Sequence, residues 1–172
     1  MNVYRLKILA TLLVLLPATS WAVKMDETTH DEVIQRLEIG VQDMDKADPD
    51  RAGILNRLAD LYADRARLKA INEIESGNQD SKASRADRSH AISLYNQVLP
   101  LTQKEKQGAI VLQLAHLHSL NDQSEKSQQL YQRILKAKKS DYSPEVRALA
   151  HYQVGEMHFR KGEFKKALAS FD

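Results

Sequence analysis

Apolar residues recur every three to four positions along most of the chain, starting close to residue 30. The first clear series is Val33, Leu37, Val41 and Met44, which would lie on one face of an α-helix. Sustained alternation of apolar and polar residues does not occur, so we expect an all-α protein without a β-sheet. The expected helices span residues 29–46, 50–75, 83–99, 103–120, 123–138, 144–161 and 163–172.

Residue types that favour helix starts occur at most of these boundaries. A hydroxyl or carboxylate residue followed three positions later by Glu forms a capping box, and this pattern begins at Thr29, Thr102 and Asp122. An acceptor side chain followed by a first-turn proline is a second start signal. It occurs at residues 48–49 and 143–144.

A repeated pattern emerges when the helices are overlaid in pairs. The first helix of each pair carries an apolar residue, a small residue and a ring three positions later: Leu58-Ala59 with Tyr62, Leu114-Ala115 with His118, and Val154-Gly155 with His158. The second helix carries a small residue with an aromatic four positions later: Ala91 with Tyr95, Ser127 with Tyr131, and Ala167 with Phe171. Because helices approach closely only where side chains are small, each pair should form a hairpin that stacks on its neighbours. Leu114 and Tyr131 are expected to be buried where the second and third hairpins meet.

The first hairpin is expected to be longer than the others. Its two small residues lie at positions 59 and 91, whereas the later pairs lie at 115 and 127 and at 155 and 167. The first interval therefore contains twenty extra residues. Within it, the polar segment 75–81 includes a glycine and is expected to be a mobile loop.

Residues 144–172 resemble a tetratricopeptide repeat (TPR), because small residues and an aromatic stand at that family's spacing: Gly155, Gly162, Ala167 and Phe171. Residues 108–138 fit more loosely, with Asp122 in place of the turn glycine, and residues 51–99 fit only with the extension. The resemblance implies a short solenoid of antiparallel hairpins, and a generic helical hairpin array is the alternative. The domains are then a signal peptide (1–22), an N-terminal helix (23–50), and hairpins at 51–100, 101–140 and 141–172. Since the last hairpin is truncated inside its second helix and a solenoid needs a capping helix, we interpret the sequence as the N-terminal part of a longer protein.

The first 22 residues have the form of a secretory signal peptide. Arg5 and Lys7 precede an apolar stretch, and small residues at Ser20 and Ala22 mark a cleavage site. The apolar stretch is about half the ~20 residues that a spanning helix needs. We therefore expect cleavage after Ala22, a periplasmic location and no membrane insertion after cleavage. Secretion and an uncleaved N-terminal anchor are the alternatives.

Composition limits the chemistry that the chain can perform. The formal charge of +2 comes from Arg5 and Lys7, so the remaining residues are neutral and give no electrostatic reason to expect nucleic acid. Cysteine is absent, as are a glycine-rich phosphate loop and a nucleophile-elbow serine. His116 and His118 point to different sides of a helix and cannot share a metal. We therefore expect no catalytic residue, no metal and no cofactor, and the sequence shows no sign of an apolar ligand cavity.

The TPR resemblance implies that the first helices of the hairpins line a concave groove that holds a peptide or a partner's helix. Residues at i, i+4 and i+7 around the small positions would form that surface: Asn56, Asp60, Leu112, His116, Tyr152, Glu156 and Phe159, with Arg160 beside them. The Lys and Asn pattern of relatives that bind a chaperone's C-terminal carboxylate is missing. The expected function is a non-catalytic, periplasmic interaction scaffold for a protein partner in a cell-envelope complex. The alternative is a docking domain of an envelope enzyme whose catalytic domain lies beyond residue 172.

Export is testable directly. Protein expressed with its leader should be recovered in the periplasmic fraction with Val23 at its N-terminus, because the cleavage site follows Ala22. Intact-mass measurement of that fraction checks the prediction. A mass that retains residues 1–22, found in the membrane fraction, would contradict it.

Overall fold

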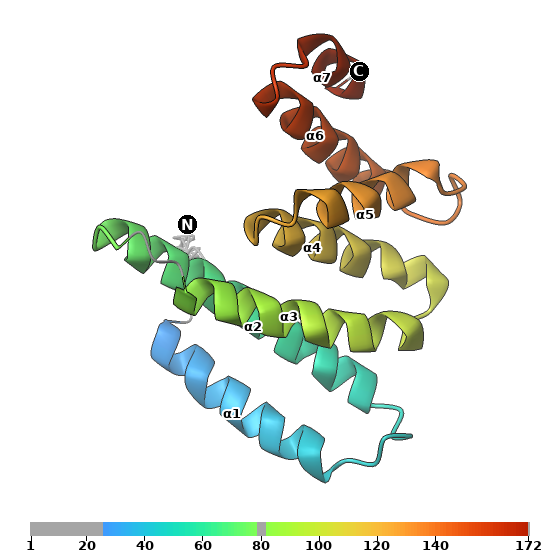
Figure 1. Ribbon diagram of the computed structural model, residues 1–172. Coiled ribbons are helices and arrows are strands. Elements are labelled where there is room, and N and C mark those ends of the chain that lie inside the picture. Colours follow the sequence, from blue (N-terminus) through green and yellow to red (C-terminus); the bar gives the residue numbers. More distant parts are fainter. Residues whose placement is uncertain (1–25, 79–81, 172) are drawn as a thin grey trace, which may run out of the picture.

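The computed structural model describes residues 26–78 and 82–171, which form helices and no β-strand (Figure 1). The all-α prediction is therefore confirmed for this part of the chain. The proposed signal peptide and residues 79–81 of the expected mobile loop lie outside it. The α-helices are α1 (Glu27–Asp43), α2 (Arg51–Glu75), α3 (Lys82–Val98), α4 (Gln107–Leu120), α5 (Ser124–Lys136), α6 (Pro144–Arg160) and α7 (Phe164–Phe171). Two short 3₁₀-helices, η1 (Leu99–Leu101) and η2 (Lys104–Lys106), lie between α3 and α4.

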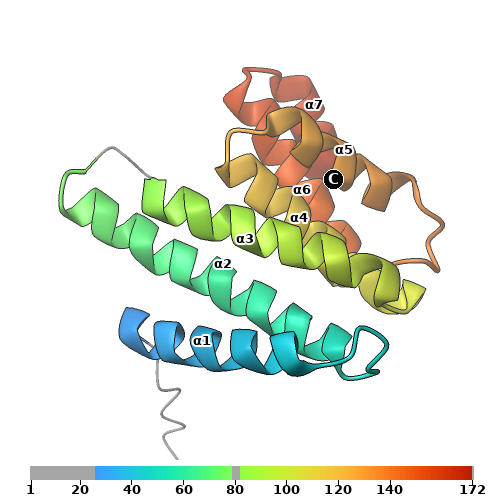
Figure 2. The ribbon, with the colours of Figure 1, turned by 60° about the horizontal axis from the view of Figure 1, so that its bottom comes forward.

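The helices pack mainly against their neighbours in the chain. The most extensive contacts join α2 with α3, α4 with α5, and α6 with α7, while α1 packs on α2. Figure 1 shows the helices in order from α1 at the bottom to α7 at the top. The α2/α3 pair is longer than the α4/α5 pair and extends past it, which Figures 1 and 2 both show. This extension accounts for the longer interval between the small residues of the first pair.

The small residues of the repeated pattern lie where paired helices meet. Ala59, Ala91, Ala115 and Ser127 are completely buried. At Gly155, an added Cβ would overlap the ring of Phe171, so only glycine allows this contact between α6 and α7. Burial of the small positions follows the packing that the repeat predicts.

The two large residues of the second copy belong to different parts of the core. Leu114 is 1 % exposed and packs in a cluster with Leu58, Leu61 and Tyr95 of the first pair. Tyr131 is equally buried but packs in a second cluster, with residues of α4 and α6. The prediction that both are buried is confirmed. Placing Leu114 at the junction with the third pair was wrong, because its face of α4 points back toward α2 and α3.

Only one of the predicted helix starts has the expected geometry. Ser143 precedes Pro144, and its Oγ accepts a hydrogen bond from the Val146 N–H at 3.4 Å. By contrast, α1 begins at Glu27 and not after Thr29. The residue that caps this helix is Asp26 and not Thr29. The Asp26 side chain accepts a hydrogen bond of 2.8 Å from the Thr29 backbone N–H. The capping prediction at Thr29 was therefore displaced by one turn.

The remaining predicted capping residues make other bonds. Asp48 accepts from the N–H of Asp50 at 2.8 Å within a turn, so α2 begins at Arg51. Thr102 donates its hydroxyl hydrogen to the Val98 carbonyl at 3.0 Å and thus binds the end of α3. Asp122 adopts a positive φ of 60° between α4 and α5 and makes no side-chain cap. Its role is that of the turn residue.

The turns that join α4 to α5 and α6 to α7 have the same construction. Gly162, forty positions after Asp122, has a φ of 73°. In both turns the residue after this position pairs with a histidine ring five residues earlier: Gln123 with His118, and Glu163 with His158. Asp122 therefore stands in place of the turn glycine, as the repeat predicts, in a left-handed conformation that Asp tolerates better than most residues.

A polar side chain at one repeat position binds the backbone ahead of each first helix. Arg51, Gln107 and Arg147 each lie eight positions before the small residue of their pair. Arg51 donates to carbonyls at the end of α1, and Arg147 donates to the carbonyls of Ile134, Leu135 and Ala137 at the end of α5. Gln107 donates to the Thr102 carbonyl at 3.0 Å. Arg51 and Arg147 thus bond to carbonyls near helix C-termini, where the last carbonyls have no intrahelical partner.

A buried carboxylate joins α3 to α2. Asp87 of α3 accepts two hydrogen bonds of 2.7 Å from Arg65 of α2, and Lys69 approaches it at 3.0 Å. Arg65 also pairs with Asp31 of α1, so the same guanidinium reaches a third helix. Burial alone would raise the pKa of the Asp87 carboxyl, but the hydrogen bonds and charges of Arg65 and Lys69 hold it below its ordinary value.

The substitution Leu114→Ala tests the core. It should lower the free energy of unfolding by about 2–5 kcal/mol, because it removes methyl groups from a packed site and leaves a cavity. The matched control Leu168→Ala, at an exposed position of α7, should change it by less than about 0.5 kcal/mol. Denaturant titrations of both variants check the prediction, and equal losses would contradict it.

The Asp87 cluster should make stability dependent on pH in the acidic range. Because the folded state lowers the pKa of Asp87, the stabilisation is complete above the unfolded value of about 4 and is lost as the pH falls through the folded value. The difference in unfolding free energy between wild type and Asp87→Asn should be constant from pH 5 to 8 and shrink below pH 4. A difference that instead shrinks as the pH rises above 6 would refute this.

Candidate functional site

Three hollows lie along α2, α4 and α6, the helices that the sequence assigns to a groove. The Tyr95 hollow has a volume of about 570 Å³ and lies between α2, the end of α3 and the start of α4. The Arg88 chamber, of about 520 Å³, lies between the second half of α2 and the end of α4. The Tyr131 hollow, of about 130 Å³, lies between α4 and α6. Gln113 lines all three, so the hollows adjoin one another along α4.

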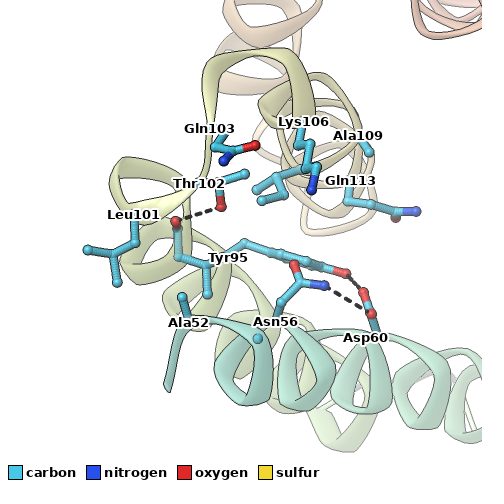
Figure 3. Close-up of a pocket in the computed structure, with 13 residues that line it drawn as sticks. Ala52, Asn56, Asp60, Tyr95, Leu101, Thr102, Gln103, Lys106, Ala109 and Gln113 are labelled. Carbon is cyan, nitrogen blue, oxygen red and sulfur yellow. Dashed lines mark hydrogen bonds between the residues drawn. The ribbon is translucent and has the colours of Figure 1, made fainter. Parts of the chain in front are cut away.

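Asn56 and Asp60 form one wall of the Tyr95 hollow (Figure 3). The Tyr95 hydroxyl donates a hydrogen bond of 2.6 Å to Asp60, and the Asn56 amide donates one of 3.3 Å to the other carboxylate oxygen. Burial and the neighbouring carboxylate raise the pKa of Tyr95 far above its usual value, so its hydroxyl stays a donor. Lys106 lies on the opposite wall, across the Tyr95 ring. The hollow thus presents a carboxylate held by two hydrogen bonds and the ammonium group of an exposed lysine.

Leu112 and His116 line the Tyr131 hollow, opposite Leu149 and Gln153 of α6. The His116 ring is partly exposed, yet loss of hydration in this wall lowers the pKa of the imidazole below its ordinary value. His116 should therefore be neutral at pH 7. A neutral imidazole and a glutamine amide can each donate and accept hydrogen bonds, so this hollow suits an uncharged polar group.

The hydroxyl group of Tyr131 has no hydrogen-bond partner among the described residues. Its counterpart in the first pair, Tyr95, binds Asp60, whereas the position equivalent to Asp60 holds His116 in the second pair. Burial raises the pKa of Tyr131 to about 12, an effect that Ser127 partly offsets. The same aromatic position therefore has a satisfied hydroxyl in one copy and an unsatisfied one in the next.

The predicted groove residues of α6 lie outside the three hollows. Tyr152 packs against Phe171 with ring centroids 5.9 Å apart, and Phe159 meets Phe164 edge-on at 5.5 Å. Both predicted rings remain about half exposed. Glu156 is half-buried and Arg160 is exposed. The structure thus brings Asn56 together with Asp60, and Leu112 with His116, but it pairs the α6 rings with α7 and not with Leu112.

Several lining residues were not identified from the sequence. Gln113 and Gln153 occupy equivalent positions of the second and third copies, two residues before the small residue, and this shared polarity was a usable signal. Ile71 and Ile74 lie in the extension of α2 and line the Arg88 chamber. Because the extension has no counterpart in the other copies, comparison of the repeats could not assign these two residues to a surface.

Among residues 26–78 and 82–171, no group of three or more His, Asp or Glu side chains could hold a metal ion. The histidines of the two turns are held by Gln123 and Glu163 and serve the fold. Over the same described residues, no helix is both long and apolar enough to cross a bilayer.

Comparison with known proteins yields no relative. No family model, curated protein or solved structure matches the chain. What can be said of its class rests on the all-helical fold and on the adjoining hollows along α4.

Proposed function

We propose that the protein is a non-catalytic, TPR-like interaction module that binds a segment of a partner protein along α2, α4 and α6. The observation that carries this proposal is the continuity of the three hollows through Gln113. A continuous surface of alternating polar and apolar sites is what an extended or helical peptide requires. The signal-like residues 1–22 support a periplasmic location, which places the partner in the cell envelope.

The lining groups match the needs of a polypeptide ligand. Asn56, Gln113 and Gln153 carry side-chain amides, which can donate to peptide carbonyls and accept from peptide N–H groups. Leu112 and Leu149 face each other across the Tyr131 hollow and offer an apolar contact. Asp60 and Lys106 provide charges of both signs in the Tyr95 hollow. This mixture favours a ligand with polar and apolar side chains in alternation.

The half-exposed rings on α6 and α7 extend this surface. Tyr152 with Phe171 and Phe159 with Phe164 form two aromatic pairs on the last hairpin. Exposed aromatic residues carry much of the binding energy in protein interfaces, and clusters of exposed apolar side chains mark interaction sites. We infer that a partner longer than the hollows would also contact these rings.

A triple substitution of the groove amides tests the proposal. Peptides that bind the purified protein would be selected from a random twelve-residue library, and their affinity would be measured by fluorescence anisotropy. The variant Asn56→Ala, Gln113→Ala, Gln153→Ala should weaken binding about tenfold or more, since it removes three hydrogen-bonding groups.

The matched control replaces the same residue types on exposed faces elsewhere: Gln35→Ala, Asn96→Ala and Gln129→Ala. It should bind the selected peptides as wild type does. Equal binding by both triple variants, or selection of no binding peptide, would refute a peptide-binding groove. Circular dichroism of both variants verifies that they keep their helical content.

A further inference from the structure

Arg88 of α3 is a buried cation without a counter-ion. It is 7 % exposed, and its Nε donates a hydrogen bond of 2.6 Å to the Asn121 side-chain oxygen. Among the described residues, no carboxylate lies within the 4 Å ion-pair distance of its guanidinium. Buried arginines are rare unless they are paired, because removal of the charge from water is costly. A bound anion that accepts hydrogen bonds from the remaining guanidinium N–H groups would therefore stabilise this buried charge.

The two carboxylates whose charges act on Arg88, Glu73 and Asp122, each bond to another side chain. Asp122 pairs with Arg85 at 2.8 Å, and Glu73 accepts a hydrogen bond of 2.7 Å from the Ser84 hydroxyl. Burial and the charge of Arg85 lower the pKa of Arg88, while Glu73 and Asp122 oppose this. Asp64 lies on the exposed rim of the chamber. Glu73 and Asp122 thus attract the Arg88 guanidinium from a distance, but neither forms an ion pair with it.

Apart from Arg88 itself, the walls of the Arg88 chamber are mostly apolar. Small side chains at Ala63, Ala66 and Ala70 of α2 leave about 520 Å³ opposite Leu117 and Leu120 of α4. This volume lies in the range of small-molecule sites, which combine apolar walls with a few polar groups. Although the sequence indicates no apolar cavity, the structure forms one where the long first hairpin extends past α4.

We propose that the Arg88 chamber binds a small monoanion with an apolar tail, of the class of free medium-chain carboxylates. The carboxylate would accept charge-assisted hydrogen bonds from Arg88, and the tail would lie along Ala70, Ile71 and Leu117. Gln113 and His116 also line the chamber, but elsewhere a peptide main chain would meet alanine, isoleucine and leucine side chains, which leave its N–H and C=O groups unsatisfied. The chamber adjoins the rest of the proposed groove through Gln113, but binding of the anion does not require a peptide there.

Calorimetric titration of the purified protein at pH 7 tests this site. Decanoate should bind saturably with a stoichiometry of one, and 1-decanol, which has the same tail but no charge, should bind at least about tenfold more weakly. The variant Arg88→Met keeps an unbranched apolar side chain and should bind decanoate at least about tenfold more weakly, with unchanged affinity for decanol. The matched control Arg36→Met, at an exposed position of α1 outside the chamber, should behave as wild type.

A second variant covers the case in which Arg88→Met fails to fold. Ala70→Phe fills the chamber from a half-buried position of α2 and should abolish binding of both probes while retaining the helical circular dichroism signal. The proposal is overturned if wild type shows no saturable binding of decanoate or binds decanol equally well. It is also overturned if folded Arg88→Met or Ala70→Phe retains wild-type affinity for decanoate. Because no peptide is present, these outcomes do not depend on the groove.

Discussion

Close approach of two helix backbones at a small residue is the constraint on which the packing depends. Ala59 and Ala115 are fully buried, and Gly155 leaves room for a ring that an added Cβ would displace. Each close contact places the aromatic residue of the second helix against the first helix, and two of these aromatics form the floors of hollows. The hollows are therefore a direct result of how the helices pair. Enlarging a small residue would separate the helices and alter the hollows together.

Helix positions could be predicted because apolar spacing alone determines which face of a segment is buried. Helix starts were harder to predict. The sequence from Thr29 has the form of a capping box. In the structure, however, Asp26 accepts the hydrogen bond from the Thr29 N–H, and the helix begins one turn earlier. Near each helix start, several side chains can accept the same backbone N–H hydrogen bonds. Which of them does so depends on the conformation of the chain that precedes the helix. Only Ser143 makes the expected bond, whereas Asp48, which also precedes a proline, accepts from Asp50 within a turn.

The candidate site was predictable only where a single helix determines it. The spacing of Asn56 and Asp60 on α2 places them in one hollow. The same reasoning linked Tyr152 and Phe159, but their contacts are rings of α7, which no pattern within α6 could reveal. The Arg88 chamber depends on a difference in length between two hairpins and on a buried charge that has no carboxylate ion-pair partner among the described residues. Both are properties of three helices at once, which periodicity does not encode.

The preference of each helix for its chain neighbours has a consequence for how the molecule loses structure. Helices that do not follow one another in the chain make few contacts. One hairpin can therefore open while others stay intact, as in repeat arrays whose stability is the sum of the stabilities of the units and of the interfaces between them. The units are unequal: α2 and α3 bury many side chains and hold the Asp87 cluster, whereas α7 buries only Ala167 among its described residues. Local stability should therefore decrease from the α2/α3 hairpin toward α7. The α2/α3 hairpin would be the last structure to melt, and the Arg88 chamber would be lost earlier, when α4 separates from this hairpin.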